Sequence, residues 1–234
     1  MKKFLTAKWH DLIMANYEVD PSLLAARVPA GTEIDLHEGR CFVSLVGFMF
    51  LDTRVLGFLV PFHVNFEEVN LRFYVRREVD GEIRRGVVFI KEIVPRFAIA
   101  AIAKTLYGEP YETAVMRNIR DTGKVKYNWI KGKRIFGLKV SRGENLGVPA
   151  VASHEEFIIE HYWGYTKRNE CRTDEYKVEH PKWTLYAARH PRISVDFGAV
   201  YGREFAFLKR KTPYSILLAK GSEISVYKGR SIKS

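Results

Sequence analysis

A strict alternation of polar and apolar side chains runs along residues 68–76. The apolar positions are Val69, Leu71, Phe73 and Val75, and the polar positions are Glu68, Asn70, Arg72, Tyr74 and Arg76. A period of two residues is that of a β-strand whose faces meet different surroundings. Asp80-Gly81 follows, and this pair between two strand-like runs is a strong hairpin signal. We therefore predict that the strand turns there and returns over residues 83–93.

Further strands are predicted along most of the chain. Residues 41–51 are almost wholly apolar, which is typical of a strand buried on both faces. Turn residues at 121–123 and 131–133 separate two more strands, 125–130 and 135–140. Later strands are expected at 157–165, 176–179, 183–188, 214–219 and 224–228.

Only a few short helices are expected. Trp9, Leu12, Ile13 and Asn16 keep a helical spacing. Asp20 can cap a second helix that begins at Pro21, and the alanine-rich stretch 96–106 is predicted to form a short buried helix. Many strands with few helices predict a mainly β (α+β) fold, an antiparallel β-barrel in a single domain spanning residues 1–234.

The composition limits the class of protein. Hydrophobic residues make up 47% and aromatic residues 13% of the sequence, which excludes a disordered chain. No run of about 18 apolar residues occurs, so neither a transmembrane helix nor a membrane partner is expected. The N-terminal segment lacks the continuous apolar centre of a secretion signal, since Lys8, His10 and Asp11 interrupt it. The expected location is therefore the cytoplasm.

The net charge of +11 is concentrated in one segment. Residues 117–142 carry nine basic side chains and one acidic one. Such a segment can form an anion-attracting surface for nucleic acid or an acidic metabolite. It can equally form two solvated hairpins whose outward lysines discourage edge-to-edge pairing. We favour the second interpretation, because no nucleic-acid motif accompanies the charge.

The order of segments between residues 66 and 112 resembles the core of the acetoacetate decarboxylase-like superfamily. A strand, a hairpin, a returning strand and an apolar stretch lead to Gly108-Glu109-Pro110-Tyr111-Glu112. Most of the remaining chain is similar to one branch of that superfamily, the DUF2071 proteins. The matching pieces are Trp9-His10-Asp11-Leu12-Ile13, Tyr17-Glu18-Val19-Asp20-Pro21, the strands at 68–75 and 86–89, Pro110-Tyr111, and Tyr176-Lys177-Val178-Glu179-His180-Pro181. The resemblance implies a β-barrel of the acetoacetate decarboxylase-like type.

The chemistry of that superfamily depends on a lysine which this sequence lacks at the corresponding position. The resemblance implies that a lysine following the proline forms an imine with a β-keto acid, after its pKa has been lowered. Here Tyr111 follows Pro110, and a tyrosine cannot form an imine. Lys91 and Lys104 are the lysines in strongly apolar surroundings. Lys104, on the predicted helix, can point into a cavity, but we favour an orientation in which its stem is packed and its amine extends to solvent. If the protein is an enzyme, the resemblance implies lyase or related carbonyl chemistry without the usual imine lysine.

The polar face of the strand at 68–76 is the leading site candidate. Glu68, Asn70, Arg72 and Tyr74 lie on one side of the sheet. If that side faces a barrel interior, Arg72 can hold a substrate carboxylate by two hydrogen bonds. If it faces water, it is an ordinary solvated strand face, and the alternation alone does not decide.

Two further residues join the candidate site by position. Tyr111 and Glu112 follow Pro110, where the resemblance implies the reactive segment. A carboxyl group in an apolar pocket has a raised pKa and can act as an acid or base. The alternative is that Pro110 only marks a turn and that Glu112 is exposed.

Neither a metal nor a cofactor is expected. His161, His180 and His190 lack the close spacing of zinc ligands. The sequence also lacks the glycine-rich motifs of dinucleotide- and nucleotide-binding proteins and the nucleophile motif of common hydrolases.

Three hypotheses for function follow. The first is a cavity that binds a small organic acid or carbonyl compound, and the second is a non-enzymatic ligand-binding or sensing protein that kept the cavity without the nucleophile. The third, and the least favoured, is a nucleic-acid or anionic-surface binder that uses the hairpins at 117–142. A homodimer is also expected, since strand-rich chains with apolar side chains at their ends often self-associate.

Overall fold

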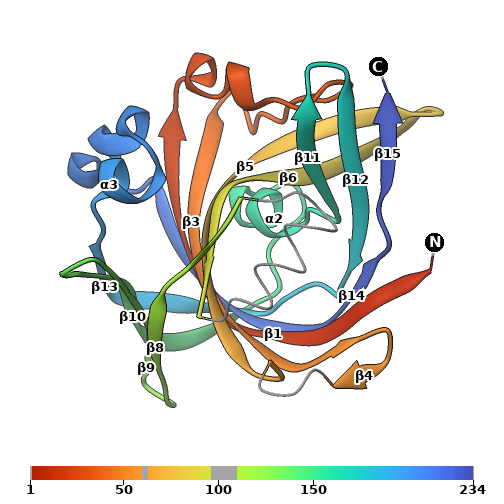
Figure 1. Cartoon of the computed structure of the whole chain (residues 1–234). Coiled ribbons are helices and arrows are strands. Elements are labelled where there is room, and N and C mark those ends of the chain that lie inside the picture. The colour runs from red at the N-terminus through yellow and green to blue at the C-terminus, as the bar shows by residue number, and fades with distance from the viewer. Residues whose placement is uncertain (1, 60–62, 96–109, 234) are drawn as a thin grey trace.

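The computed structural model describes residues 2–59, 63–95 and 110–233 and is mainly β, with a few short helices (Figure 1). The strands are β1 (Lys3–Val19), β2 (Glu33–Ile34), β3 (Cys41–Val55), β4 (Phe58–Leu59), β5 (Phe66–Val79), β6 (Glu82–Val94), β7 (Tyr111–Thr113), β8 (Val115–Arg120), β9 (Lys124–Lys131), β10 (Arg134–Gly147), β11 (Trp163–Asn169), β12 (Arg172–Glu179), β13 (Leu185–Ser194), β14 (Ser215–Tyr227) and β15 (Arg230–Lys233). The helices are the 3₁₀ turns η1 (Pro21–Leu23), η2 (Ala25–Arg27) and η3 (Arg203–Arg210), and the α-helices α2 (His154–Ile159) and α3 (Phe197–Tyr201).

The central sheet closes on itself. Its strand order is β15-β12-β11-β6-β5-β3-β1-β14-β13-β10-β9-β8, and β12 also pairs with β14. Within the described residues, the strands from β12 to β14 therefore form a ring of seven, and α2 lies inside it (Figure 1). Most pairs are antiparallel, whereas β6 pairs in parallel with both β7 and β11. A closed sheet removes the edges at which strands aggregate.

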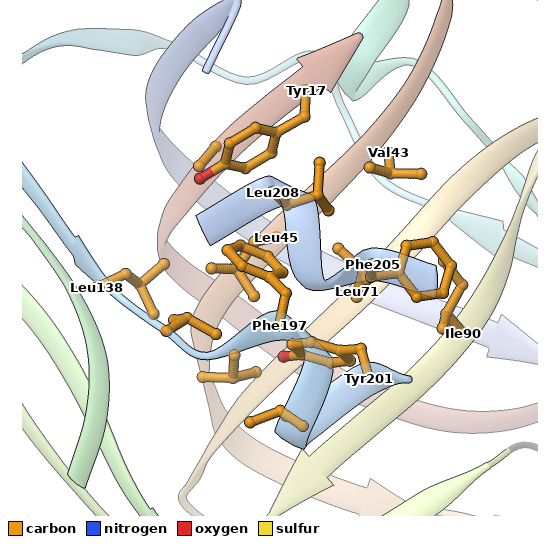
Figure 2. Close-up of a cluster of buried hydrophobic side chains, with 14 of the residues drawn as sticks. Tyr17, Val43, Leu45, Leu71, Ile90, Leu138, Phe197, Tyr201, Phe205 and Leu208 are labelled. Carbon is orange, nitrogen blue, oxygen red and sulfur yellow. The ribbon is translucent and has the colours of Figure 1, made fainter. Parts of the chain in front are cut away.

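The outer face of one wall of the ring carries a large apolar core. Val43 on β3 and Leu71 on β5 point outward and pack with side chains of α3 and η3, among them Phe197 and Phe205 (Figure 2). The hairpin strands β9 and β10 add side chains such as Leu138 to the same cluster. This covering explains why the predicted strand at 41–51 is apolar on both faces, since β3 is buried inside and outside.

The inner face packs against α2. Ser153 caps this helix, because its side chain accepts a hydrogen bond from the backbone N–H of Glu156. Phe157, Ile158 and Ile159 are buried and join a second apolar cluster, which includes Phe42 of β3. The short helix therefore fills part of the ring interior and leaves room only on one side of itself.

Several predicted elements are confirmed. The turn at Asp80-Gly81 joins β5 to β6, and Val79 pairs with Glu82. The strands expected at 125–130 and 135–140 are found in β9 and β10. Asp20 caps η1 through a hydrogen bond from the backbone N–H of Ser22, so this helix exists as a single 3₁₀ turn.

The helix predicted around Trp9 to Asn16 is wrong, because these residues lie in β1. The pairing of β1 with β3 shifts between His10 and Ile13, where Asp11 has a φ of 55°. This bulge changes which face each side chain meets, and the resulting pattern imitates a helical spacing. Trp9 and Leu12 both face the ring interior as a result.

Two other predictions need correction, and one lies outside the described residues. The strand expected at 157–165 is instead α2 followed by β11, because the cap at Ser153 starts a helix. The strands expected at 214–219 and 224–228 are one long strand, β14, which passes through Gly221 at a φ of 80°. The predicted helix at 96–106 falls outside the described residues. No helix in the described ranges is long and apolar enough to cross a membrane.

His161 lies just after α2 and is buried inside the ring. Its ring centroid is 4.6 Å from that of Tyr74 and 5.3 Å from that of Phe157. Its Nε2 lies 3.5 Å from Oδ2 of Asp35, whose carboxylate accepts a 2.7 Å hydrogen bond from Nε of Arg85. Burial lowers the pKa of His161 to about 4, so the ring is neutral at pH 7.

Replacing Gly86 with Ala is expected to reduce the free energy of unfolding by about 2 kcal/mol. An added Cβ would lie 2.6 Å from Cε2 of Tyr165 and 2.7 Å from the carbonyl oxygen of Trp163. Gly86 pairs with Trp163 where β6 meets β11, so the clash falls on the ring itself. Urea denaturation measures the change, with Gly123→Ala as the control, since the nearest atom there lies 3.8 Å from the added Cβ. Equal losses in both variants would contradict the argument.

The free energy of unfolding is expected to fall as the pH drops from 6.5, the ordinary pKa of histidine, towards about 4, the pKa of His161 in the folded protein. In this range the histidine of the unfolded chain binds a proton and the buried histidine does not, which favours the unfolded state. The stability that the neutral, buried His161 allows is therefore fully present above pH 6.5 and is lost on acidification. The loss between pH 7 and pH 4.5 is about 2–3 kcal/mol. Denaturant unfolding at several pH values should show a flatter dependence in His161→Phe. The exposed-site control His190→Asn should keep the wild-type slope, and an unchanged slope in His161→Phe would refute the assignment.

Candidate functional site

The ring encloses a cavity of about 130 Å³, here called the central cavity. All seven strands of the ring contribute side chains to its lining, and so do β7 and α2. Most of the described lining residues are aromatic or aliphatic. The polar minority includes Glu68, Asn70, Arg72, Glu92 and Tyr111.

The polar stripe of β5 faces this cavity. Glu68, Asn70 and Arg72 line it, with exposed fractions of 2%, 1% and 8%. Nδ2 of Asn70 donates a 2.9 Å hydrogen bond to Oε1 of Glu68. The alternation predicted from the sequence therefore separates two buried environments, and the solvated-face alternative is excluded for these three residues.

Arg72 has an unusual environment for a buried guanidinium group. Within the described residues, no carboxylate oxygen lies within ion-pair distance of it, and its buried Nε has no hydrogen-bond partner. Its Cζ lies 5.7 Å from the centroid of the Tyr74 ring, a cation–π distance. A buried charge without an opposite charge is costly, so the site favours an anion beside Arg72.

Tyr74 supports the cavity without lining it. Its hydroxyl lies 2.6 Å from Oγ of Ser44, and that Oγ donates a 2.6 Å hydrogen bond to Oδ1 of Asn16. Its ring contacts both the guanidinium group of Arg72, at 5.7 Å, and the neutral ring of His161, at 4.6 Å. Tyr74 is thus placed to hold Arg72 and His161 in position. Tyr74 lies on the same face of β5 as the rest of the polar stripe, as predicted, but it does not line the cavity.

Tyr111 and Glu112 lie on opposite sides of β7. Tyr111 lines the central cavity and pairs with Glu92 of β6. Glu112 is turned to the outer face, where Lys91 Nζ lies 3.0 Å and Lys131 Nζ 2.9 Å from its carboxylate oxygens. Burial tends to raise the pKa of Glu112, but the two lysines outweigh this and lower it. The structure therefore does not place Glu112 in the cavity, because successive residues of a strand point to opposite faces.

The lysines named from the sequence do not supply a nucleophile in the described part of the site. Lys91 lies on the outer face, where its Nζ also donates to the carbonyl oxygen of Val200 at 2.5 Å. Lys104 lies outside the described residues. Among the described residues that line the cavity there is no lysine.

Sequence reasoning missed Glu92 and the aromatic side chains of the cavity. Glu92 pairs with Asn70, and Arg72 pairs with Phe89, because the register of β6 against β5 shifts by one residue between Leu71 and Arg72. On either side of this shift, the residues of β6 that face the cavity change from odd to even numbers. That bulge leaves no clear mark in the sequence. Trp9 is in the cavity because of the second bulge, in β1, and was assigned to a helix instead. Glu92 follows Lys91 near the end of β6, so the sequence itself does not distinguish it from an ordinary exposed charge.

Part of the basic segment is used inside the protein. Arg120 and Arg142 both pair with the carboxylate of Asp11, which is only 4% exposed. At the surface, the exposed side chain of Arg134 pairs with Asp196 at 3.2 Å. These ion pairs favour the structural interpretation of residues 117–142 over an anion-binding surface.

The three histidines considered as metal ligands lie in different environments. His161 is buried, His180 stacks on Trp183 with ring centroids 4.2 Å apart, and His190 is exposed. Within the described ranges, no three histidine, cysteine or acidic side chains lie close enough together to hold a metal ion.

Comparison with known proteins agrees with the sheet and with the sequence resemblance. The chain matches the model of the DUF2071 family, described as an uncharacterized conserved protein, over residues 6–223. It is 30% identical over 194 residues to the uncharacterized protein YqjF of Bacillus subtilis strain 168, a match that covers 80% of this chain and 77% of YqjF.

Solved structures with the same fold are far more distant in sequence. Acetoacetate decarboxylase from Legionella pneumophila has a TM-score of 0.70 at 13% identity, covering 99% of this chain and 88% of that one. An acetoacetate decarboxylase-like enzyme from Sphingomonas wittichii RW1 has a TM-score of 0.65 at 12% identity, covering 100% and 95%. The enduracididine biosynthesis enzyme MppR, complexed with pyruvate, has a TM-score of 0.66 at 13% identity, covering 99% and 91%. At these identities the likeness concerns the fold alone. The chain belongs to the DUF2071 family and has the fold of the acetoacetate decarboxylase-like proteins.

Proposed function

We propose that the central cavity binds a small organic acid or carbonyl compound whose anionic group pairs with Arg72. The observation that carries the proposal is the burial of this guanidinium group without an ion-pair partner among the described residues. A carboxylate can accept two parallel hydrogen bonds from an arginine, which fixes both its position and its orientation. The apolar side chains that make up most of the described lining lower the local dielectric constant, which strengthens that attraction.

The size of the cavity supports a small ligand. Its volume of about 130 Å³ is close to that of an engineered apolar cavity, about 150 Å³, that accepts benzene. A related fold is known with a ligand of this class, since the structure of MppR contains pyruvate. Cavities of this kind, with few polar groups among apolar walls, are the usual setting of small-molecule sites.

The proposed binding requires no covalent bond to the protein. Tyr111 occupies the position at which the resemblance implies an imine lysine, and its side chain lines the cavity. A phenol can exchange hydrogen bonds with a carbonyl or carboxylate oxygen but cannot form an imine. Asn70 and Glu68 offer further hydrogen-bonding groups on the same stripe. We therefore propose a ligand-binding protein that orients its ligand between Arg72 and Tyr111.

Arg72→Met is expected to abolish binding of small organic acids while increasing the stability of the ligand-free protein by about 1–3 kcal/mol. Methionine fills a similar volume and removes a buried charge that lacks a partner. Thermal shift with pyruvate and a panel of related acids measures binding, and urea denaturation measures stability. Arg76→Met is the matched control, because Arg76 lies on the same strand but is exposed and pairs with Glu33 at 2.7 Å. Acid binding that survives in Arg72→Met would sink the proposal.

Treatment with pyruvate and borohydride is expected to leave the mass of the protein unchanged. Borohydride reduces an imine to a stable secondary amine, so it traps any lysine that has reacted with a keto acid. Intact-protein mass spectrometry reads the result directly. Tyr111→Lys is the informative companion variant, because it restores an amine at the cavity wall. A trapped adduct in the wild-type protein would show that a lysine elsewhere takes the role.

A further inference from the structure

One wall of the central cavity is a continuous layer of aromatic rings. Trp9 of β1 meets Phe48 of β3 and Trp183 edge to face, with ring centroids 5.3 Å and 6.1 Å apart. The layer continues from Phe48 to Phe50 at 5.2 Å, and Phe50 stacks on Phe66 at 4.6 Å with an interplanar angle of 11°. All five residues line the cavity. We refer to them as the aromatic wall.

The charged groups of the cavity come from one part of its lining. Among the described lining residues, the carboxyl and guanidinium side chains are Glu68, Arg72 and Glu92, which belong to the neighbouring strands β5 and β6. Three imidazole side chains, those of His63, His161 and His180, line the cavity outside these two strands. The aromatic wall supplies no charge, and Nε1 of Trp183 already donates to Oγ of Ser222 at 2.9 Å. A ligand therefore meets the guanidinium and carboxyl groups on β5 and β6 and a largely apolar surface of aromatic rings along its body, in which Nε1 of Trp9 is a buried donor without a hydrogen-bond partner among the described residues.

The two ends lie within reach of a single small molecule. His180 stacks on Trp183 of the aromatic wall. Arg72 and the five rings of the aromatic wall line the same cavity of about 130 Å³, so a molecule that fills this volume contacts both. A carboxylate on Arg72 would direct the rest of its molecule along the rings.

We infer that the ligand is a monocarboxylic acid, such as a 2-oxo acid, with an apolar body of about benzene size or less. This inference rests on the proposed function, since it takes Arg72 as the site of the carboxylate. A dicarboxylate fits poorly, because the described lining offers one guanidinium group and two acidic side chains, Glu68 and Glu92, so a second carboxylate on the ligand would lack a guanidinium partner.

The expected selectivity can be given as a ratio of affinities. Each buried CH₂ or CH₃ group contributes about 0.8 kcal/mol, which is roughly a fourfold change in the dissociation constant. Pyruvate and 3-methyl-2-oxobutanoate share the 2-oxo acid group and differ by two carbon atoms. The branched acid is therefore expected to bind about 15-fold more tightly than pyruvate. The five-carbon dicarboxylate 2-oxoglutarate is expected to bind more weakly than pyruvate.

Isothermal titration calorimetry of the full chain with these three acids tests the inference. Binding of the branched acid at least several-fold above pyruvate, with 2-oxoglutarate last, would support it. Equal affinities for pyruvate and the branched acid, or a preference for 2-oxoglutarate, would overturn it and leave the proposed function standing. Absence of binding for all three acids would overturn the proposed function together with the inference.

A pair of neighbouring valines supplies matched variants. Val87 lines the cavity, whereas Val88 points to the outer core and is buried to a similar extent. Val87→Thr keeps the volume of the side chain and places a hydroxyl in the cavity wall, which should weaken binding of 3-methyl-2-oxobutanoate roughly fivefold. Val88→Thr introduces the same hydroxyl on the other face of β6 and should leave the affinities for pyruvate and for 3-methyl-2-oxobutanoate unchanged. Equal losses in the two variants would show a general loss of stability and would count against the inference.

Discussion

The burial of β5 on both faces is the constraint on which the rest of the structure depends. Its outer side chains, such as Leu71 and Phe73, pack into the core that α3 and η3 cover. At the inner face, Phe66 and Tyr74 join the second apolar cluster. Between them, this face carries Asn70 and Arg72, which contribute little to a hydrophobic core. A strand with only one buried face could not separate stability from binding in this way.

The cost of the polar stripe is concentrated at Arg72. Asn70 and Glu68 share a hydrogen bond, and Tyr74 is held by Ser44, so part of the interior polarity is satisfied within the protein. Arg72 is held by packing against the Tyr74 ring, and no described acid approaches it to ion-pair distance. Proteins keep such destabilising groups where function needs them, and stability must then come from elsewhere in the fold. Here the outer core supplies it.

The sequence was sufficient to predict the strands in which polar and apolar side chains alternate, or apolar side chains continue, without interruption by a bulge. The hairpin of β5 and β6 and the apolar strand β3 follow from alternation, from Asp80-Gly81 and from continuous hydrophobicity. It was not sufficient where a bulge changes the parity of a strand. The shift around Asp11 made β1 look helical, and the shift between Leu71 and Arg72 concealed Glu92.

The direction of the polar face was a separate problem. Alternation states that two faces differ, but it cannot state which of them lies inside a closed sheet, because that depends on strands distant in sequence. The same limit explains Glu112, since one residue decides whether a side chain of β7 meets the cavity or the lysines outside it. The family resemblance located the segment, and only the pairing of β7 with β6 assigned its two sides.

That pairing also explains how a common fold can change its chemistry at one position. Parallel pairing of β7 with β6 directs the side chain after Pro110 into the cavity, whatever that side chain is. A lysine there would offer an amine to a carbonyl group, whereas Tyr111 offers only a hydroxyl for hydrogen bonding. The backbone therefore fixes a place for a functional group, and the residue that occupies it decides between covalent chemistry and binding. The proposed function follows from this position, because Tyr111 offers no amine and lines the same cavity as Arg72 and the aromatic wall.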